Sequence, residues 1–267
     1  MRSFTWLLCA VLSLVLAGPS RAQIAPPNAM GVSVGHLHDI SKDVEGEAKF
    51  WTAIGGVSVG TGRMRTIKFP GILVLIQAGE NTGGSAGSVV DHAAFLVKDA
   101  KAALAKWKEA GLNVTAPFNA SNQGAFLLTP DGIRLEFAED TSLMEPIVFH
   151  HIQWITPDPV AIKAWYVKTF GAVPGKRNNF EAADLPGGNL TFQQATPPAV
   201  TVPTRGRALD HISFEVKDLA SFCKKLEADG QKFDAPCNPR PGAATSITYI
   251  TDPFGTYIEL TQGLNRY

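Results

Sequence analysis

The placement of the six histidines in this chain is the first indication of chemistry. All six lie in short apolar or alternating stretches typical of strands, namely His36, His38, His92, His150, His151 and His211. Two glutamates stand at matching places, because Glu136 and Glu259 each follow a turn glycine by four residues. Two imidazoles and one carboxylate are a common ligand set for a divalent first-row metal such as Fe(II), Mn, Ni or Zn. The sequence therefore predicts metal binding by at least one of two triplets, which are His36, His92 and Glu136, and His151, His211 and Glu259.

Three further residues are candidates for catalysis because they lie on or near the strands of these ligands. His38 shares a strand face with His36, so it could bind the metal or act as a base. Glu215 shares the face of His211 and could act as a general base, although a polar position at a domain edge is its more ordinary interpretation. Tyr249 lies just before a turn and could donate a hydrogen bond to a bound oxyanion.

The histidine strands belong to a unit that occurs four times. The frame D-H-x-x-F-x-V-K-D appears at 91–99 and again at 210–218, and looser copies begin at His36 and His151. Each histidine strand precedes an Asp suited to cap a helix, a stretch with apolar residues at helical spacing, and a glycine. Strand-like runs separated by turns such as P-D-G follow. The sequence predicts a βαβββ unit, repeated at 32–80, 88–139, 148–196 and 207–264.

The four units are expected to form two domains. The second and fourth copies resemble each other more closely than either resembles its predecessor, which favours pairing consecutive units into domains at 30–140 and 148–264. Because each unit combines one helix with several strand-like runs, the predicted class is α+β, with four βαβββ modules.

These features together resemble the vicinal oxygen chelate (VOC) superfamily, which includes glyoxalase I, bleomycin resistance proteins and extradiol dioxygenases. The resemblance rests on the H-x(6)-D starts, on the aromatic pairs before Gly55 and Gly171, and on the ending Y-I-T-D-P-F-G-T-Y-I-E-L. It implies cupped mixed sheets around a pocket, with metal ligands on the first strands and the last strand, and by position these are the six residues of the two triplets. It also implies a small substrate that chelates the metal through neighbouring oxygens.

The particular reaction stays open. Four modules in one chain are similar to extradiol dioxygenases, but Arg240-Pro-Gly stands where that group has a further histidine. Glyoxalase I commonly has a glutamate or glutamine where this chain has second-module histidines. The sequence therefore predicts a divalent-metal-dependent lyase, isomerase or dioxygenase, and the alternative is a protein of this superfamily that binds a small molecule without metal or catalysis.

Residues 1–22 have the layout of a secretory signal peptide, with Arg2, an apolar run, and the small-x-small pattern at Ser20-Arg-Ala22. We expect a periplasmic or extracellular protein without a membrane segment after cleavage. With 24 basic and 24 acidic residues and no charge cluster, nucleic acid is not an expected partner. In such a compartment Cys223 and Cys237 could form a disulfide or remain separate thiols, and both a monomer and a homodimer are compatible with the sequence.

Overall fold

The computed structural model describes residues 24–266 apart from four gaps at 60–63, 119–123, 197–200 and 240–241. The signal peptide predicted at residues 1–22 and the arginine at position 240 lie outside the described residues. Within the described part of the chain, no helix is both long enough and apolar enough to cross a membrane.

Three of the four predicted units fold as βαβββ, which confirms the α+β class. The first contains β1 (Val32–Ser41), α1 (Val44–Ala53), β2 (Val57–Val59), β3 (Met64–Phe69) and β4 (Ile72–Ala78). The second contains β5 (Val90–Val97), α2 (Ala100–Glu109), β6 (Asn113–Ala116), β7 (Gly124–Leu128) and β8 (Arg134–Glu139). The third contains β9 (Ile147–Thr156), α3 (Pro159–Phe170), β10 (Val173–Arg177), β11 (Phe180–Leu185) and β12 (Gly188–Gln194).

The fourth unit departs from the prediction. It contains β13 (Leu209–Val216), α4 (Leu219–Ala228), β14 (Ser246–Thr251) and β15 (Tyr257–Gln262), followed by the short 3-10 helix η1 (Leu264–Arg266). Between α4 and β14 the described residues form only an isolated bridge from Phe233 to Ile250. Pro236 and Pro239 lie in this segment, and proline has no N–H to donate to a strand ladder. A disulfide between Cys223 and Cys237 ties the segment to α4.

Each helix begins where the sequence predicts it, because an aspartate caps its first turn. The side chains of Asp43, Asp99, Asp158 and Asp218 each accept a hydrogen bond from the backbone N–H three residues later. Gly171 ends α3 in the left-handed conformation, with φ of 68°, which glycine adopts without a side-chain clash. These local signals fix the strand before each helix, and that strand carries the histidines.

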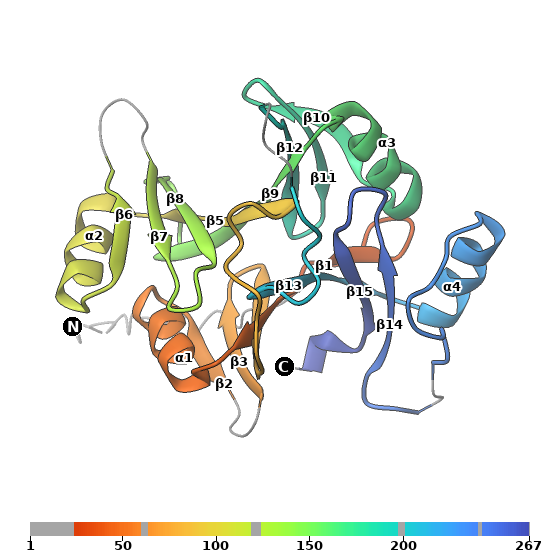
Figure 1. Ribbon diagram of the computed structural model, residues 1–267, viewed down its shortest axis with the longest axis horizontal. Coiled ribbons are helices and arrows are strands. Elements are labelled where there is room, and N and C mark those ends of the chain that lie inside the picture. The colour runs from red at the N-terminus through yellow and green to blue at the C-terminus, as the bar shows by residue number, and fades with distance from the viewer. Residues whose placement is uncertain (1–23, 60–63, 119–123, 197–200, 240–241, 267) are drawn as a thin grey trace, which may run out of the picture.

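The two sheets each combine units that are far apart in the sequence. The seven-stranded sheet has the order β14-β15-β13-β1-β4-β3-β2, so it joins the first unit to the fourth through the antiparallel pair β1–β13. The eight-stranded sheet has the order β10-β11-β12-β9-β5-β8-β7-β6, so it joins the second unit to the third through β5–β9. In Figure 1 the eight-stranded sheet runs from β10–β12 at the top to β6 at the left, and the seven-stranded sheet runs from β14 and β15, right of centre, to β2 and β3 at the lower centre.

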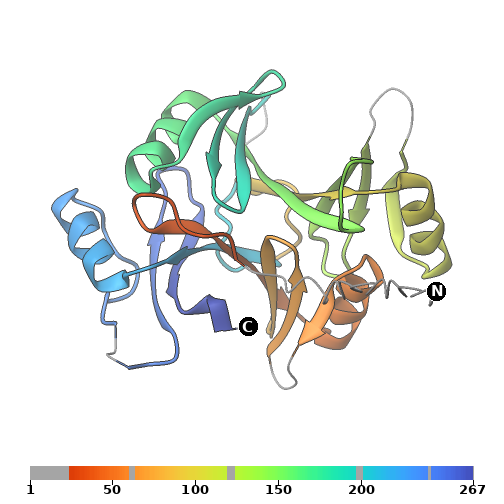
Figure 2. The ribbon, with the colours of Figure 1, turned by 180° about the vertical axis from the view of Figure 1, so that it is seen from behind.

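The aromatic cores, in contrast, join consecutive units. Phe95 of the second unit contacts Trp51 and Phe69 of the first, with ring centroids 6.3 and 4.9 Å apart. Phe214 of the fourth unit contacts Tyr166 and Phe170 of the third, at 6.2 and 4.5 Å. Accordingly, α1 and α2 lie at one end of the molecule, and α3 and α4 at the other (Figures 1 and 2). The ranges 30–140 and 148–264 therefore each enclose a shared aromatic core, while both sheets run from one range into the other.

Candidate metal centres

The junctions between units in the two sheets decide which histidines meet. The structure groups the candidate ligands as His36, His38 and His211, near Glu259, and as His92, Glu136 and His151. We call the first group, with Glu259, the β1–β13 cluster, and the second the β5–β9 cluster. The two triplets predicted from the sequence are therefore wrong in their grouping, although all six residues do gather in clusters. His36 lies with His211 and His151 lies with His92, because the first strand of each odd-numbered unit pairs with a strand from the other half of the chain.

The β1–β13 cluster brings three imidazoles and one carboxylate together in a buried place. One nitrogen each of His36, His38 and His211 lies within 4.8 Å of the others. The Glu259 oxygens lie 3.3 Å from His211 Nε2 and 3.9 Å from His36 Nε2. Ligands arranged as a tetrahedron at about 2.1 Å from a metal are about 3.4 Å apart, so this spacing is close to what a metal centre needs.

Several buried nitrogens of this cluster have no hydrogen-bond partner among the described residues. They are both ring nitrogens of His36 and Nδ1 of His38. His211 Nε2, by contrast, has the Glu259 carboxylate at 3.3 Å. A buried polar atom without a partner costs about 1–3 kcal/mol, so such atoms are rare unless something else satisfies them. Burial lowers the pKa of His36 to about 3 and that of His38 to about 4, so both rings are neutral near pH 7. A neutral imidazole with an unused lone pair can bind a metal. The histidines of this cluster, with the Glu259 carboxylate, therefore fit a divalent cation.

Neighbouring side chains hold these ligands in orientation. Asp210 Oδ1 lies 2.6 Å from His211 Nδ1, which turns Nε2 of that ring toward the cluster. Thr261 Oγ1 donates to Glu259 Oε1 at 2.5 Å. Burial alone would raise the pKa of Glu259, but His211, His36 and Thr261 outweigh it and hold that pKa below its ordinary value. Glu259 is therefore a carboxylate, as a cation ligand must be.

The two predicted catalytic residues nearest the ligands lie in this cluster. The ring of His38 is stacked on that of His211 with centroids 4.2 Å apart, and its Nε2 lies 3.2 Å from Gln77 Oε1. Tyr249 donates its hydroxyl to Glu259 Oε2 at 2.7 Å, and burial raises its pKa above the ordinary value, so the phenol keeps its proton. In this geometry the Tyr249 hydroxyl supports a ligand.

Glu215, the third predicted catalytic residue, is not brought to the ligands. Its carboxylate accepts hydrogen bonds from the backbone N–H groups of Gly263 and Leu264, at 2.9 and 3.1 Å. Four strand positions separate it from His211, or about 13 Å. Glu215 therefore holds the C-terminal turn, and its interpretation as a general base was wrong.

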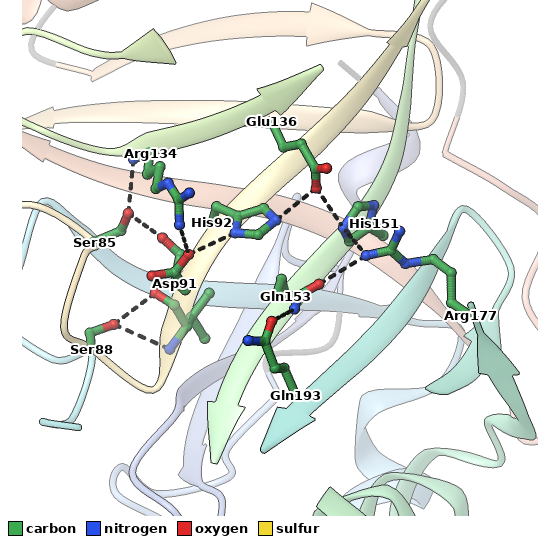
Figure 3. Close-up of polar contacts among 11 residues, drawn as sticks. Ser85, Ser88, Asp91, His92, Arg134, Glu136, His151, Gln153, Arg177 and Gln193 are labelled. Atoms are coloured by element: carbon green, nitrogen blue, oxygen red, sulfur yellow. Dashed lines mark hydrogen bonds and ion pairs between the residues drawn. The ribbon is translucent and has the colours of Figure 1, made fainter. Parts of the chain in front are cut away.

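The β5–β9 cluster has the same ligand types but a different neighbour (Figure 3). Glu136 Oε2 lies 2.9 Å from His92 Nε2 and 3.4 Å from His151 Nε2. Asp91 Oδ2 lies 2.7 Å from His92 Nδ1. However, Nη2 of Arg177 lies 2.8 Å from His151 Nε2, so a guanidinium faces the nitrogen that a metal would use. The sequence analysis missed Arg177, because nothing in the run V-P-G-K-R marks it before the strands are paired.

A groove of about 890 Å³ lies away from both clusters. Its lining is mostly apolar and comes from the region of α1, α2 and the segment between β8 and β9, including Ile54, Trp107 and Met144. None of its lining residues belongs to either cluster. The candidate chemistry therefore rests on the buried clusters.

Comparisons with known proteins confirm the family resemblance and the fold. Residues 148–260 match the model of the Glyoxalase/Bleomycin resistance protein/Dioxygenase superfamily. No curated protein matches the chain.

Two solved structures share the fold over most of this chain. Glyoxalase I from Zea mays is similar at 17% sequence identity and a TM-score of 0.66, covering 86% of this chain and 92% of that one. A proposed dioxygenase from Bacillus subtilis is similar at 15% identity and a TM-score of 0.66, covering 91% of this chain and 88% of that one. The chain therefore has a glyoxalase I-like fold of two domains.

Proposed function

We propose that this protein is a divalent-metal-dependent enzyme whose active centre is the β1–β13 cluster, with His36, His211 and Glu259 as metal ligands. The observation that carries the proposal is the buried, neutral pair His36 and His38, whose ring nitrogens are mostly without a hydrogen-bond partner among the described residues, beside His211 and the Glu259 carboxylate. The proposed substrate is a small molecule with two neighbouring oxygens, and the reaction is a lyase, isomerase or dioxygenase reaction.

The metal would act as a Lewis acid on a chelated substrate oxygen. His38 would accept the substrate proton at Nδ1, because its Nε2 lies against the Gln77 oxygen and the Nδ1 lone pair has no partner in the described chain. Asp210 would keep His211 oriented, and Tyr249 would hold Glu259 in place. The burial of all four cluster side chains would exclude bulk water from the reacting atoms.

One observation favours the alternative, a small-molecule-binding protein without metal. His36 and His38 are paired in the sheet with Leu73 and Leu75, which share their face. Ile24 and Leu264 join these two leucines in a separate apolar cluster. An apolar surface beside the histidines suits an apolar ligand as well as a substrate.

The deciding experiment is the metal content of the mature protein, purified without chelator or histidine tag. We expect about one metal ion per chain, lost in His211→Ala. His92→Ala is the matched control, because His92 is the corresponding histidine of the other cluster, and it should keep the metal. Little metal in the wild type, unchanged in His211→Ala, would exclude the metal-dependent enzyme and leave the metal-free binding protein. With metal established, a panel of catechols and α-hydroxycarbonyl compounds tests turnover.

We also propose that the protein is secreted and cleaved after Ala22. The disulfide between Cys223 and Cys237 supports this, because disulfides persist mainly in oxidising compartments. The test is the intact mass of the exported protein, expected to begin at Gln23. A cytosolic protein that retains residues 1–22 would contradict the proposal.

A further inference from the structure

The two clusters occupy equivalent places in the two sheets, so their residues can be compared one by one. In the seven-stranded sheet, β1 of the first unit pairs with β13 of the fourth unit, and β13 pairs with β15. In the eight-stranded sheet, β9 of the third unit pairs with β5 of the second unit, and β5 pairs with β8. His36 corresponds to His151, His211 to His92, and Glu259 to Glu136. The oriented histidine has an aspartate on Nδ1 in both cases, Asp210 at 2.6 Å and Asp91 at 2.7 Å.

Beyond these shared features, the clusters differ in what faces the histidine of the odd-numbered unit, which is His36 in one cluster and His151 in the other. Both ring nitrogens of His36 are buried without a partner among the described residues. Nε2 of His151 instead faces the Arg177 guanidinium at 2.8 Å, and Figure 3 shows the guanidinium directed from β10 into the cluster.

Arg177 is held in this place by several acceptors. Its Nε donates to Thr191 Oγ1 at 2.7 Å, and its Nη2 donates to Gln153 Oε1 at 2.9 Å. A guanidinium keeps its positive charge at all accessible pH values, and its planar shape fixes the direction of its N–H groups. The positive charge of the β5–β9 cluster therefore comes from the chain itself.

We infer that Arg177 takes the place of a divalent cation in the β5–β9 cluster, which is thereby a latent metal site closed by a side chain. The lone pair of His151 Nε2 cannot accept an N–H and bind a metal at the same time. A divalent ion among these ligands would also lie beside the guanidinium charge, which repels it. Removing the guanidinium leaves His92, Glu136 and His151 at a spacing that suits a metal, with Asp91 still orienting His92.

The inference predicts that shortening Arg177 creates a metal site. The experiment measures bound Co(II) per chain by equilibrium dialysis in the wild type, Arg177→Ala, Arg177→Lys and the double variant Arg177→Ala/His151→Ala. We expect Arg177→Ala to bind one metal ion more per chain than the wild type. Arg177→Lys, which keeps the charge, and the double variant, which lacks a ligand, should show no gain. Lys176→Ala is the control for a neighbouring basic residue outside the cluster.

The outcome does not depend on the proposed function, because it is the difference from the wild type, whatever the β1–β13 cluster binds. A folded Arg177→Ala without additional metal would overturn the inference. A second measurement needs no variant at position 177, namely the ¹⁵N resonances of the His151 ring in the wild type during addition of Zn(II). They should stay unchanged at one equivalent, and a shift of the His151 signals would also overturn the inference.

Discussion

The β1–β13 and β5–β9 clusters show how one ligand set can have two different electrostatic environments. Both have two histidines and a glutamate at equivalent strand positions, and an aspartate behind one histidine. In the β1–β13 cluster, the nitrogens of His36 have no hydrogen-bond partner among the residues that the structure describes, and in the β5–β9 cluster Arg177 donates to His151. The difference teaches that a ligand pattern is necessary for a metal centre but does not establish one, because a single cation from a neighbouring strand satisfies the same lone pairs.

The largest expected effect concerns His38, which corresponds to Gln153 in the other cluster. In that cluster Gln153 donates to Gln193, just as His38 contacts Gln77. His38→Gln should therefore keep the hydrogen bond and the metal but remove the proton acceptor. We expect turnover of a substrate found in the panel to fall by roughly 10²–10⁴-fold, with metal content unchanged. Loss of the metal in His38→Gln would instead identify His38 as a ligand.

The second prediction compares the two aromatic cores, since the core within residues 30–140 contains a buried pair of acids. Asp39 and Glu47 are both fully buried, and Asp39 accepts a hydrogen bond from Trp51. Burial raises the pKa of Glu47 from 4.5 to about 7. The stabilisation by the protonated acid is therefore fully present below about pH 4.5 and is lost as the pH rises to about 7. At ~1.4 kcal/mol per pH unit, the free energy of unfolding should fall by about 3 kcal/mol over this interval.

Urea unfolding at pH 5 and pH 8 measures this loss of stability. Glu47→Gln should reduce the pH dependence, because an amide stays neutral throughout, while Asp39, whose pKa burial also raises, keeps its own contribution. Glu45→Gln, on the same helix but at a more exposed position, should leave the dependence as in the wild type. An equal loss of unfolding free energy between pH 5 and pH 8 in the wild type and in Glu47→Gln would show that other groups cause the pH dependence.

How much of this molecule the sequence predicts depends on whether the signal is local. Asp43 and its three counterparts cap the helices through bonds to residues three positions on, so the sequence shows the units directly. The pairing of β1 with β13 is set by packing between distant segments, so the sequence grouped His36 with the wrong partners. Arg177 was missed for the same reason, because its contacts lie on β9 and β12.

The third prediction tests the shared aspartates, which the sequence does show beside the histidines. Asp210→Asn weakens the hydrogen bond that orients His211, and such changes typically weaken metal binding by 10–100-fold. Asp91→Asn is the matched change in the β5–β9 cluster, and it should leave the metal affinity of the protein unchanged. Isothermal titration with Zn(II) measures both. Equal losses in the two variants would show that both clusters bind metal.

The smallest effect is expected where the clusters differ by one oxygen. Tyr249 and Phe126 are the cross-strand partners of Glu259 and Glu136, and both rings stand edge-on to the oriented histidine, at 5.5 and 5.8 Å. Tyr249→Phe removes the hydrogen bond to Glu259 Oε2 and makes the β1–β13 cluster resemble its counterpart. A hydrogen bond to a charged group contributes about 1.5–3 kcal/mol, and coordination of the freed oxygen would offset part of its loss. We therefore expect about a tenfold weaker affinity for Zn(II), or ~1.4 kcal/mol. Affinity that rises in Tyr249→Phe would mean that the tyrosine competes with the metal for Glu259, and its role would then be to keep the carboxylate satisfied until the metal binds.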